Sequence, residues 1–219
     1  MNIGIIGSGH IGGTLTRRFR ALGHHVSVAN SRGPESLAGL ARETGAKAAT
    51  VIEAAHAGEV VVVTIPLGRV PELPKDLFAG VSDSVTVIDT CNYYPHRDGQ
   101  IDEILNGMPE SVWVSHQLAR PVVKAFNNIY ARHLMENGRP PGEANRIALP
   151  VAGDNPHHKL VVMHLVDELG FDPVDAGPLS ESWRQLPGTP VYTTDHDAEG
   201  VRRALKEASR ERRPEFRTA

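Results

Sequence analysis

Close to its N-terminus the chain reads Ile3-Gly4-Ile5-Ile6-Gly7-Ser8-Gly9-His10-Ile11-Gly12, an apolar run followed by three glycines spaced G-x-G-x-x-G. A helix-like stretch from Ile11 to Leu22 follows directly, so the pattern predicts strand, tight turn and helix. In such a unit the first glycine makes the turn, the second lets the backbone approach a pyrophosphate, and the third lets helix and strand pack closely. The helix N-terminus adds free N–H groups and the positive end of its dipole. The opening of the chain therefore predicts a dinucleotide-binding turn.

The nucleotide is selected where the second predicted strand ends, at Asn30-Ser31-Arg32. A site for NAD needs a carboxylate there, about 20 residues past the glycines, to accept hydrogen bonds from the ribose. The first acid downstream is Glu35, which falls in the next predicted helix. Ser31 and Arg32 instead offer a hydroxyl and a guanidinium to a 2′-phosphate, which favours NADP over NAD. The alternative is that both residues only cap the start of that helix.

Composition narrows the class of protein. The chain has 219 residues and a net charge of −3, which suits one α/β unit with a sizeable core and does not indicate a nucleic-acid partner. No run reaches the roughly 18 uncharged apolar residues of a membrane helix, and Met1 leads directly into the first predicted strand. We therefore expect a cytosolic protein without a membrane partner. A single cysteine, Cys91, excludes an internal disulfide, and no metal site is predicted.

Apolar runs alternate with helical patterns along the first 138 residues. Strands are expected at 2–6, 25–30, 46–49, 59–64, 84–89 and 122–126, and helices at 11–22, 34–43, 67–79 and 129–137. This alternation indicates a parallel sheet covered on both faces. The predicted fold is α/β, a Rossmann-type, doubly wound, mainly parallel sheet with a small C-terminal α/β lobe. The irregular segment 91–99 leaves a carboxyl end of the sheet, the edge where such folds bind ligands, and is a site candidate.

The segment Gly138-Arg139-Pro140-Pro141-Gly142 is the clearest boundary in the sequence. It divides a predicted NADP-binding Rossmann domain at 1–138 from a smaller lobe at 139–219 that covers the acceptor and is not independent. In the lobe, strands are expected at 147–152 and 173–175, and helices at 156–169 and 198–210. Residues 211–219 form a charged tail that is expected to fray.

Four segments together resemble the family of deazaflavin-dependent NADP oxidoreductases, which use coenzyme F420. They are the glycine turn at 7–12, Asn30-Ser31-Arg32, Lys124-Ala125-Phe126-Asn127, and the stretch 170–177. The resemblance implies a Rossmann domain that holds NADP(H), a C-terminal part that covers a cleft for the hydride acceptor, and a homodimer. It also implies that residues 64–66, 92 and 125–127 surround the nicotinamide. The residues expected at the cofactor are Gly7, Ser8, Gly9, His10, Ile11, Gly12, Asn30, Ser31, Arg32, Thr64, Ile65, Pro66, Asn92, Ala125 and Asn127.

After Leu179 the chain departs from these reductases, so the resemblance leaves the acceptor open. The departing segment carries Trp183 and Arg184. These two side chains suit stacking on, and pairing with, an aromatic or anionic acceptor. The alternative is that Trp183 anchors the final segment to the core and Arg184 is a rim charge.

The acceptor decides whether the protein must supply an acid. Hydride transfer to a flavin-like acceptor needs alignment and exclusion of water, whereas a ketone or imine also needs a proton donor. Candidate donors are Tyr93, Tyr94, His96 and His196, and none is assigned as catalytic.

Lys124 and Asn128 have the Lys-x-x-x-Asn spacing that β-hydroxyacid dehydrogenases place on a helix. Here the stretch 122–126 reads as a strand and not as a helix, and residues four apart along a strand are about 13 Å from each other, so this interpretation is rejected. Lys124 is expected to pair with a carboxylate or to orient a loop. Asn127 is expected to bond the nicotinamide amide or neighbouring backbone.

The sequence therefore predicts an NADP(H)-dependent oxidoreductase, a reductase that transfers a hydride between NADPH and a flavin-like, deazaflavin or small carbonyl or imine acceptor. F420 or a flavin is the acceptor that the resemblance suggests. A second hypothesis is an NADPH-binding regulatory or sensing module without turnover. A third hypothesis is an acyl-transfer enzyme with Cys91 as its nucleophile, but no neighbouring sequence supplies a base for it.

Overall fold

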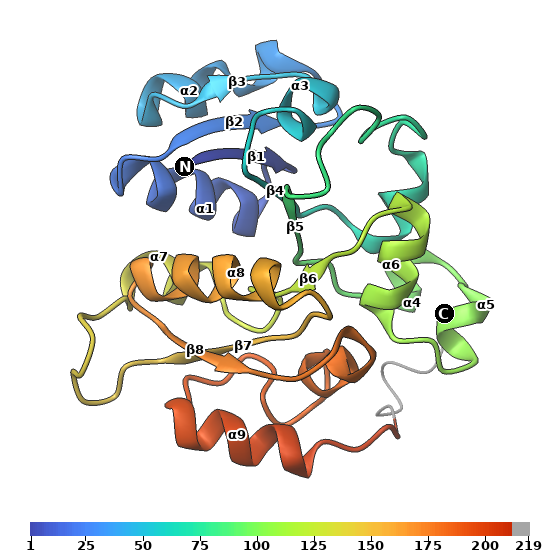
Figure 1. Cartoon of the computed structure of the whole chain (residues 1–219), viewed down its shortest axis with the longest axis vertical. Helices are drawn as coiled ribbons and strands as arrows, with labels where there is room; N and C mark the ends of the chain where they lie inside the picture. Colours follow the sequence, from blue (N-terminus) through green and yellow to red (C-terminus); the bar gives the residue numbers. More distant parts are fainter. Residues whose placement is uncertain (212–219) are drawn as a thin grey trace.

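The computed structural model describes residues 1–211, and its centre is a six-stranded parallel sheet (Figure 1). The strand order is β3-β2-β1-β4-β5-β6, which is the order of a dinucleotide-binding Rossmann sheet. The strands are β1 (Asn2–Ile6), β2 (His25–Ala29), β3 (Lys47–Ala48), β4 (Val60–Val63), β5 (Thr86–Asp89) and β6 (Val123–Lys124). The predicted α/β class and Rossmann-type topology are confirmed.

Apolar side chains on both faces hold the sheet together. Ile3 and Ile5 of β1 enter one buried cluster, while Ile6 points to the other side and enters a second. The four valines of β4 divide in the same way and are all fully buried. A strand buried on both faces is what a parallel sheet covered by helices requires. The carboxyl ends of β1, β4, β5 and β6 are thereby held along one edge of the sheet.

Helices cover the two faces of the sheet. The helix α1 (His10–Ala21) packs Leu15 and Phe19 on one face, and α3 (Val51–Ala55) packs Ala54 and Ala55 on the other. The remaining helices of this part are α2 (Ala38–Thr44), α4 (Pro95–Asp98), α5 (Asp102–Leu105), α6 (Glu110–Leu118) and α7 (Ala131–Glu136), with 3-10 helices η1 (Pro34–Leu37) and η2 (Leu67–Glu72).

Three expectations about elements are wrong. The helix expected at 67–79 is only the short 3-10 helix η2, because Pro71 and Pro74 each lack the N–H that a longer helix needs. The strand expected at 122–126 is shortened to β6, since Phe126 takes a φ of 60° that a strand does not allow. The segment 91–99 is not wholly irregular, because it contains α4.

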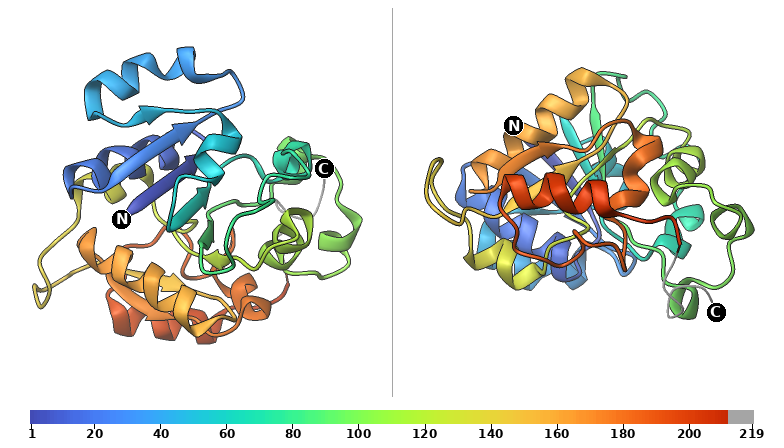
Figure 2. Two further views of the ribbon diagram at one scale, coloured as in Figure 1. Left: turned by 45° about the horizontal axis from the view of Figure 1, so that its top comes forward. Right: turned by 90° about the horizontal axis from the view of Figure 1, so that it is seen from below.

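A second sheet of two parallel strands, β7 (Ala148–Val151) and β8 (Asp172–Asp175), follows residue 138. It lies between α8 (Pro156–Glu168) and α9 (Ala198–Glu207), as the two views of Figure 2 show, and the 3-10 helix η3 (Leu179–Gln185) precedes α9. The expected elements of the lobe are thus present.

The two sheets are directly connected. Helix α8 contacts β5 and β6 as well as β7 and β8, and Lys124 forms an antiparallel bridge with Ala152. One buried cluster runs from Ile3 and Ile88 of the large sheet to Leu149 and Phe171 of the lobe. The domain division at residue 138 stays a prediction. Of the tail expected to fray at 211–219, residues 212–219 lie outside the described residues.

Within residues 1–211, no helix has the length and apolar character needed to cross a bilayer. In the same part of the chain, no cluster of three or more His, Cys, Asp or Glu side chains is placed to hold a metal ion.

Candidate functional site

The three glycines of the first turn have different surroundings. Gly7 has a φ of 117°, and a Cβ atom there would overlap the Thr64 carbonyl oxygen. A Cβ atom on Gly12 would overlap the Gly7 carbonyl oxygen, so this glycine lets α1 pack against the turn. Gly9 has an ordinary φ of −72°, and nothing lies within 4 Å of the position of its missing Cβ. The fold requires Gly7 and Gly12, whereas Gly9 leaves open space that a ligand can enter.

Helix α1 begins at this open space. Gly9 is its N-cap residue, no side chain caps the helix, and its first turn contains no acidic residue. The first N–H groups of a helix have no partner within the helix and carry partial positive charge. The turn therefore suits an anion such as a phosphate.

Asn30 connects this turn to the loop after β2. Its side-chain amide donates to Ser8 Oγ at 3.2 Å and to Ser36 Oγ at 2.9 Å, and its Oδ1 accepts from the Arg32 N–H at 2.9 Å. Ser31 and Arg32 are both exposed next to it. Asn30 thus shapes the loop, while the polar groups of Ser31 and Arg32 remain accessible to a ligand.

An open groove of about 650 Å³ extends from the glycine turn to α7. We call it the turn groove. It is lined by Ser8, Gly9, His10, Gly13, Thr14, Arg17, Arg32, Ser36, Leu37, Leu40, Ala131, Arg132, Met135 and Glu136. The lining residues that the sequence prediction did not include are Gly13, Thr14, Arg17, Ser36, Leu37, Leu40 and the four residues of α7. Among them, only Ser36 could have been suspected from the sequence, because it follows Arg32 closely.

A second opening of about 470 Å³, the tyrosine hollow, adjoins the turn groove and shares His10, Ala131 and Arg132 with it. Its other lining residues are Ile11, Asn92, Asn127, Ile129, Tyr130, His133, Tyr192 and Thr193. The structure therefore brings the predicted residues Asn92 and Asn127 to one opening that continues from the glycine turn.

Three side-chain amides form the polar wall behind the tyrosine hollow. Asn127 Nδ2 donates to Asn92 Oδ1 at 2.9 Å and to the Gln185 carbonyl at 2.8 Å. Gln185 Nε2 donates to Asn127 Oδ1 at 3.0 Å. Asn127 is thus held by protein groups, and Gln185, which the sequence prediction missed, links it to η3.

The other residues expected near the nicotinamide lie outside both openings. The Thr64 carbonyl and the Ile65 side chain contact the position beside Gly7, Pro66 is exposed, and Ala125 is fully buried. The structure therefore separates a lining pair, Asn92 and Asn127, from Thr64 and Ile65, which pack beside the glycine turn.

A buried ion pair holds the backbone of Cys91, the residue before Asn92. Lys124 Nζ is 3.1 Å from Asp89 Oδ2, and both side chains are fully buried. Lys124 also donates to the Cys91 carbonyl, and Asp89 Oδ1 accepts from the Cys91 N–H at 2.8 Å. The expected carboxylate partner of Lys124 is confirmed. Asn128 bonds the Val191 carbonyl instead, so rejection of the Lys-x-x-x-Asn interpretation is also supported.

Cys91 is not a competent nucleophile in this environment. Its side chain is buried, and burial, followed by the negative charge of Asp89, raises the pKa of its thiol well above the ordinary value. The thiolate is the reactive form of cysteine. The acyl-transfer hypothesis therefore has no support at Cys91.

Of the four candidate proton donors, one connects to the tyrosine hollow. Tyr94 Oη lies 2.5 Å from Oη of Tyr192, which lines the hollow. The Tyr93 hydroxyl donates to the Gly99 carbonyl from a buried position. His96 is exposed, and His196 packs against the first turn of α9, so neither lines the hollow. Tyr192 was not among the candidates, because no local pattern marks it.

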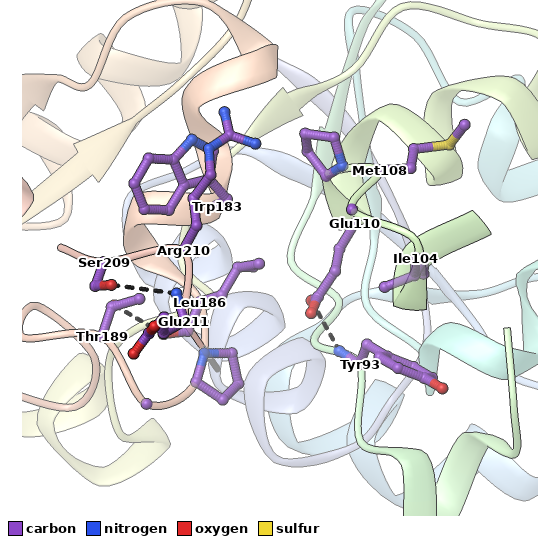
Figure 3. A pocket seen from close by; sticks show the side chains of 14 residues that line it. Tyr93, Ile104, Met108, Glu110, Trp183, Leu186, Thr189, Ser209, Arg210 and Glu211 are labelled. Carbon is purple, nitrogen blue, oxygen red and sulfur yellow. Dashed lines mark hydrogen bonds between the residues drawn. The ribbon is translucent and has the colours of Figure 1, made fainter. Parts of the chain in front are cut away.

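Trp183 lies in a separate pocket of about 100 Å³ (Figure 3). It faces Tyr93, Ile104, Met108 and Glu110 across this pocket, and it lines neither the turn groove nor the tyrosine hollow. The guanidinium groups of Arg184 and Arg210 lie 4.6 and 4.7 Å from its ring, and Arg184 also bonds the Leu205 carbonyl. Trp183 therefore lies apart from the glycine turn and from Asn127, and its contacts agree with the alternative in which it anchors the final segment to the core.

Comparisons with known proteins agree with this geometry. Residues 2–93 match the family model described as NADP oxidoreductase coenzyme F420-dependent. A hypothetical protein from Sinorhizobium meliloti has a similar structure, with a TM-score of 0.73 and 31% identity over 89% of this chain and 94% of that one. A proposed F420-dependent NADP reductase from Arthrobacter sp. FB24 has a TM-score of 0.68 and 22% identity over 83% and 87% of the two chains, and thus the same fold.

A curated relative, the YjhV protein of Escherichia coli (strain K12), is 48% identical over 69 residues, which are 32% of this chain. The match spans 50% of the length of that relative.

Proposed function

Because the chain belongs to the family of coenzyme F420-dependent NADP oxidoreductases, we propose that it is a reductase that transfers a hydride between NADPH and a small-molecule acceptor. One observation carries the proposal: the open position at Gly9 lies at an uncapped helix N-terminus, and the same groove contains Arg32. This combination suits a pyrophosphate at the helix N-terminus and a second phosphate beside Arg32. The absence of a carboxylate at 30–32 favours NADP over NAD.

The described residues fit a bound dinucleotide. The N–H groups at the start of α1 would hold the pyrophosphate, and Ser31 and Arg32 would hold the 2′-phosphate. Asn92 and Asn127 would border the nicotinamide, because they line the hollow that continues from the turn. When bound, the cofactor supplies the hydride; the protein orients it and excludes water.

The acceptor is proposed to bind in the tyrosine hollow, and it is a deazaflavin such as F420, a flavin, or a small carbonyl or imine compound. A homodimer, a cytosolic location, and the absence of nucleic-acid and membrane partners stay predictions. Binding of NADPH without oxidation by any of these acceptors would instead favour the sensing module.

Discrimination between cofactors tests the proposal. We expect wild-type protein to bind NADPH more tightly than NADH, because charge-assisted hydrogen bonds to a 2′-phosphate contribute roughly 1.5–3 kcal/mol each. One such bond corresponds to roughly tenfold to over a hundredfold in Kd. Fluorescence titration of both cofactors measures this preference, which Arg32→Ala should largely remove.

The control is Arg42→Ala, since Arg42 is an exposed arginine of α2 outside the groove lining. This variant should keep the wild-type preference. Equal affinities of the wild-type protein for NADPH and NADH would contradict the cofactor assignment.

A further inference from the structure

Two tyrosines that are far apart in the sequence meet at the tyrosine hollow. Tyr192 lines the hollow together with Asn92 and Asn127, and its hydroxyl is 2.5 Å from that of Tyr94. Tyr94 follows β5, whereas Tyr192 belongs to the segment between η3 and α9. The closed fold therefore presents a hydrogen-bonded phenol on the hollow where the acceptor is proposed to bind.

The backbone on both sides of Tyr192 is fixed. Thr193 donates its N–H to the Asn128 carbonyl at 2.8 Å and has a φ of 54°. A β-branched residue rarely adopts this left-handed conformation. Val191, before the tyrosine, is fully buried. The segment that carries Tyr192 is thus attached to the residue that follows Asn127, which keeps the phenol on the same wall as the amides.

The surroundings of Tyr192 keep its hydroxyl protonated. Burial, followed by the hydrogen bond with Tyr94, raises the pKa of Tyr192 above its ordinary value of 10, and Tyr130 and Glu110 act in the same direction. The other titratable side chains of the hollow are His10, Arg132 and His133, the last of which pairs with Asp195 at 2.9 Å. Tyr192 therefore carries its proton near neutral pH, so it can enter a reaction as an acid and cannot act as a base.

We propose that the acceptor is a carbonyl or imine compound, that Tyr192 is the catalytic residue that protonates it, and that Tyr94 is a positioning residue. This inference rests on the proposed function. The C=O or C=N carbon gains the hydride that NADPH supplies, and the π electron pair moves to the oxygen or nitrogen. That atom takes the proton of Tyr192. The resulting phenolate regains its proton from solvent.

A flavin or deazaflavin makes a different demand on the protein. Its ring system takes the hydride and can exchange protons with solvent at a ring nitrogen, so a phenol on the wall would be dispensable. The consequence of removing the Tyr192 hydroxyl therefore distinguishes the two acceptor classes.

The kinetic test uses the full chain with NADPH and a panel of cyclohexanone, benzaldehyde, 1-pyrroline and riboflavin. We expect oxidation of NADPH by at least one of the first three compounds. Tyr192→Phe should lower kcat for it by about 100-fold or more, as removal of a general acid does, with NADPH affinity and Tm close to wild type. Tyr94→Phe should lower kcat by a smaller factor. Tyr93→Phe is the matched control, because the Tyr93 hydroxyl bonds Gly99 away from the hollow, and it should keep kcat.

Absorbance at 295 nm during an alkaline titration gives a second readout without turnover. Tyr192→Phe should remove one ionisation, which identifies that of Tyr192, and Tyr94→Phe should move this ionisation to lower pH. An unchanged ionisation of Tyr192 in Tyr94→Phe would contradict the hydrogen bond between the two tyrosine hydroxyls.

Three results would overturn the inference: oxidation of NADPH by riboflavin alone, oxidation by no compound of the panel, or an unaltered kcat in Tyr192→Phe. In each case, binding of NADPH by the wild-type protein would still uphold the cofactor assignment. Failure of the wild-type protein to bind NADPH would overturn the proposed function, and this inference with it.

Discussion

Gly9 and Gly12 belong to one motif, but different partners constrain them. A side chain at position 12 would overlap the Gly7 carbonyl, whereas a side chain at position 9 would enter empty space. The protein itself therefore needs Gly12, while the need for Gly9 arises only when a ligand is bound. This distinction allows substitutions to separate folding from binding.

We expect Gly9→Val to abolish NADPH binding and to leave the fold intact, because its isopropyl group fills the space that a pyrophosphate would use. Thermal melts with and without NADPH measure both effects. A ligand at 100 times its Kd stabilises a protein by about 2.7 kcal/mol, which raises Tm by roughly 5–10 °C in a domain of this size. Wild type should show this shift and Gly9→Val should not.

Gly12→Ala provides the comparison, since its added methyl group should lower Tm even without ligand. Retention of the full NADPH-induced shift by Gly9→Val would mean that the glycine turn has only an architectural role.

The carboxyl ends of β5 and β6 are held by the Asp89–Lys124 pair, in which Asp89 also accepts from Ser111 Oγ at 2.7 Å. Removing one partner of a buried pair leaves an uncompensated charge and typically costs about 3–5 kcal/mol. We expect Lys124→Met to lower the free energy of unfolding by about this amount. Adding Asp89→Asn to this variant should cost less than the sum of the two single changes.

Urea unfolding of the four proteins of this cycle gives the coupling. Arg69→Ala breaks the exposed Arg69–Glu72 pair and should cost less than about 1 kcal/mol. Equal losses in the free energy of unfolding for Lys124→Met and Arg69→Ala would contradict the expectation that a buried ion pair contributes more to stability than an exposed one.

Elements with a strong local pattern were predictable from the sequence. Two features indicated the Rossmann fold, namely the apolar runs of β1, β4 and β5 and the glycines before α1. At these positions the local sequence pattern agrees with the backbone conformation that the fold requires. Helix α6 received no prediction; its Ser111-Val112-Trp113-Val114 run has β-branched and aromatic residues that favour strands. Its helical state depends on packing of Trp113 and Val114 into the core.

The candidate site was predictable only in part, for a related reason. Gly9, Arg32, Asn92 and Asn127 stand at strand ends that a parallel sheet must bring together. Tyr192 and Gln185 come from segments without regular periodicity, and only the closed fold places them beside Asn127. Contacts between distant segments have no local signature.

For the whole molecule, helix α8 joins the large sheet to the small one, and His24 contributes to its attachment. His24 is buried; its Nε2 is 3.3 Å from Glu168 Oε2 at the end of α8, and its Nδ1 is 3.1 Å from the Met1 amino group. Burial, followed by the charge of that amino group, lowers the pKa of His24 below its ordinary value of 6.5.

This lowered pKa predicts how stability depends on pH. Below pH 6.5 the unfolded chain binds a proton at His24 more readily than the folded chain does, so the stabilisation is complete above this pH and is lost as the pH falls. We expect the urea midpoint to fall between pH 7.5 and pH 5.5, and His24→Asn to reduce this fall. His25→Asn, which changes the exposed neighbour, should keep the wild-type dependence. An identical dependence in both variants would show that His24 contributes nothing.

The core shared by the two sheets has a consequence for synthesis. A polypeptide is made from its N-terminus, and its domains generally fold as they emerge. Here the cluster that includes Ile88 and Phe126 is completed by Leu149, Leu165 and Phe171, which are made later. A nascent chain that ends near residue 138 therefore exposes an apolar surface that it cannot cover, a state in which chaperones hold many proteins. The tyrosine hollow is completed later still, when residue 192 has left the ribosome, so assembly of this site follows translation of most of the chain.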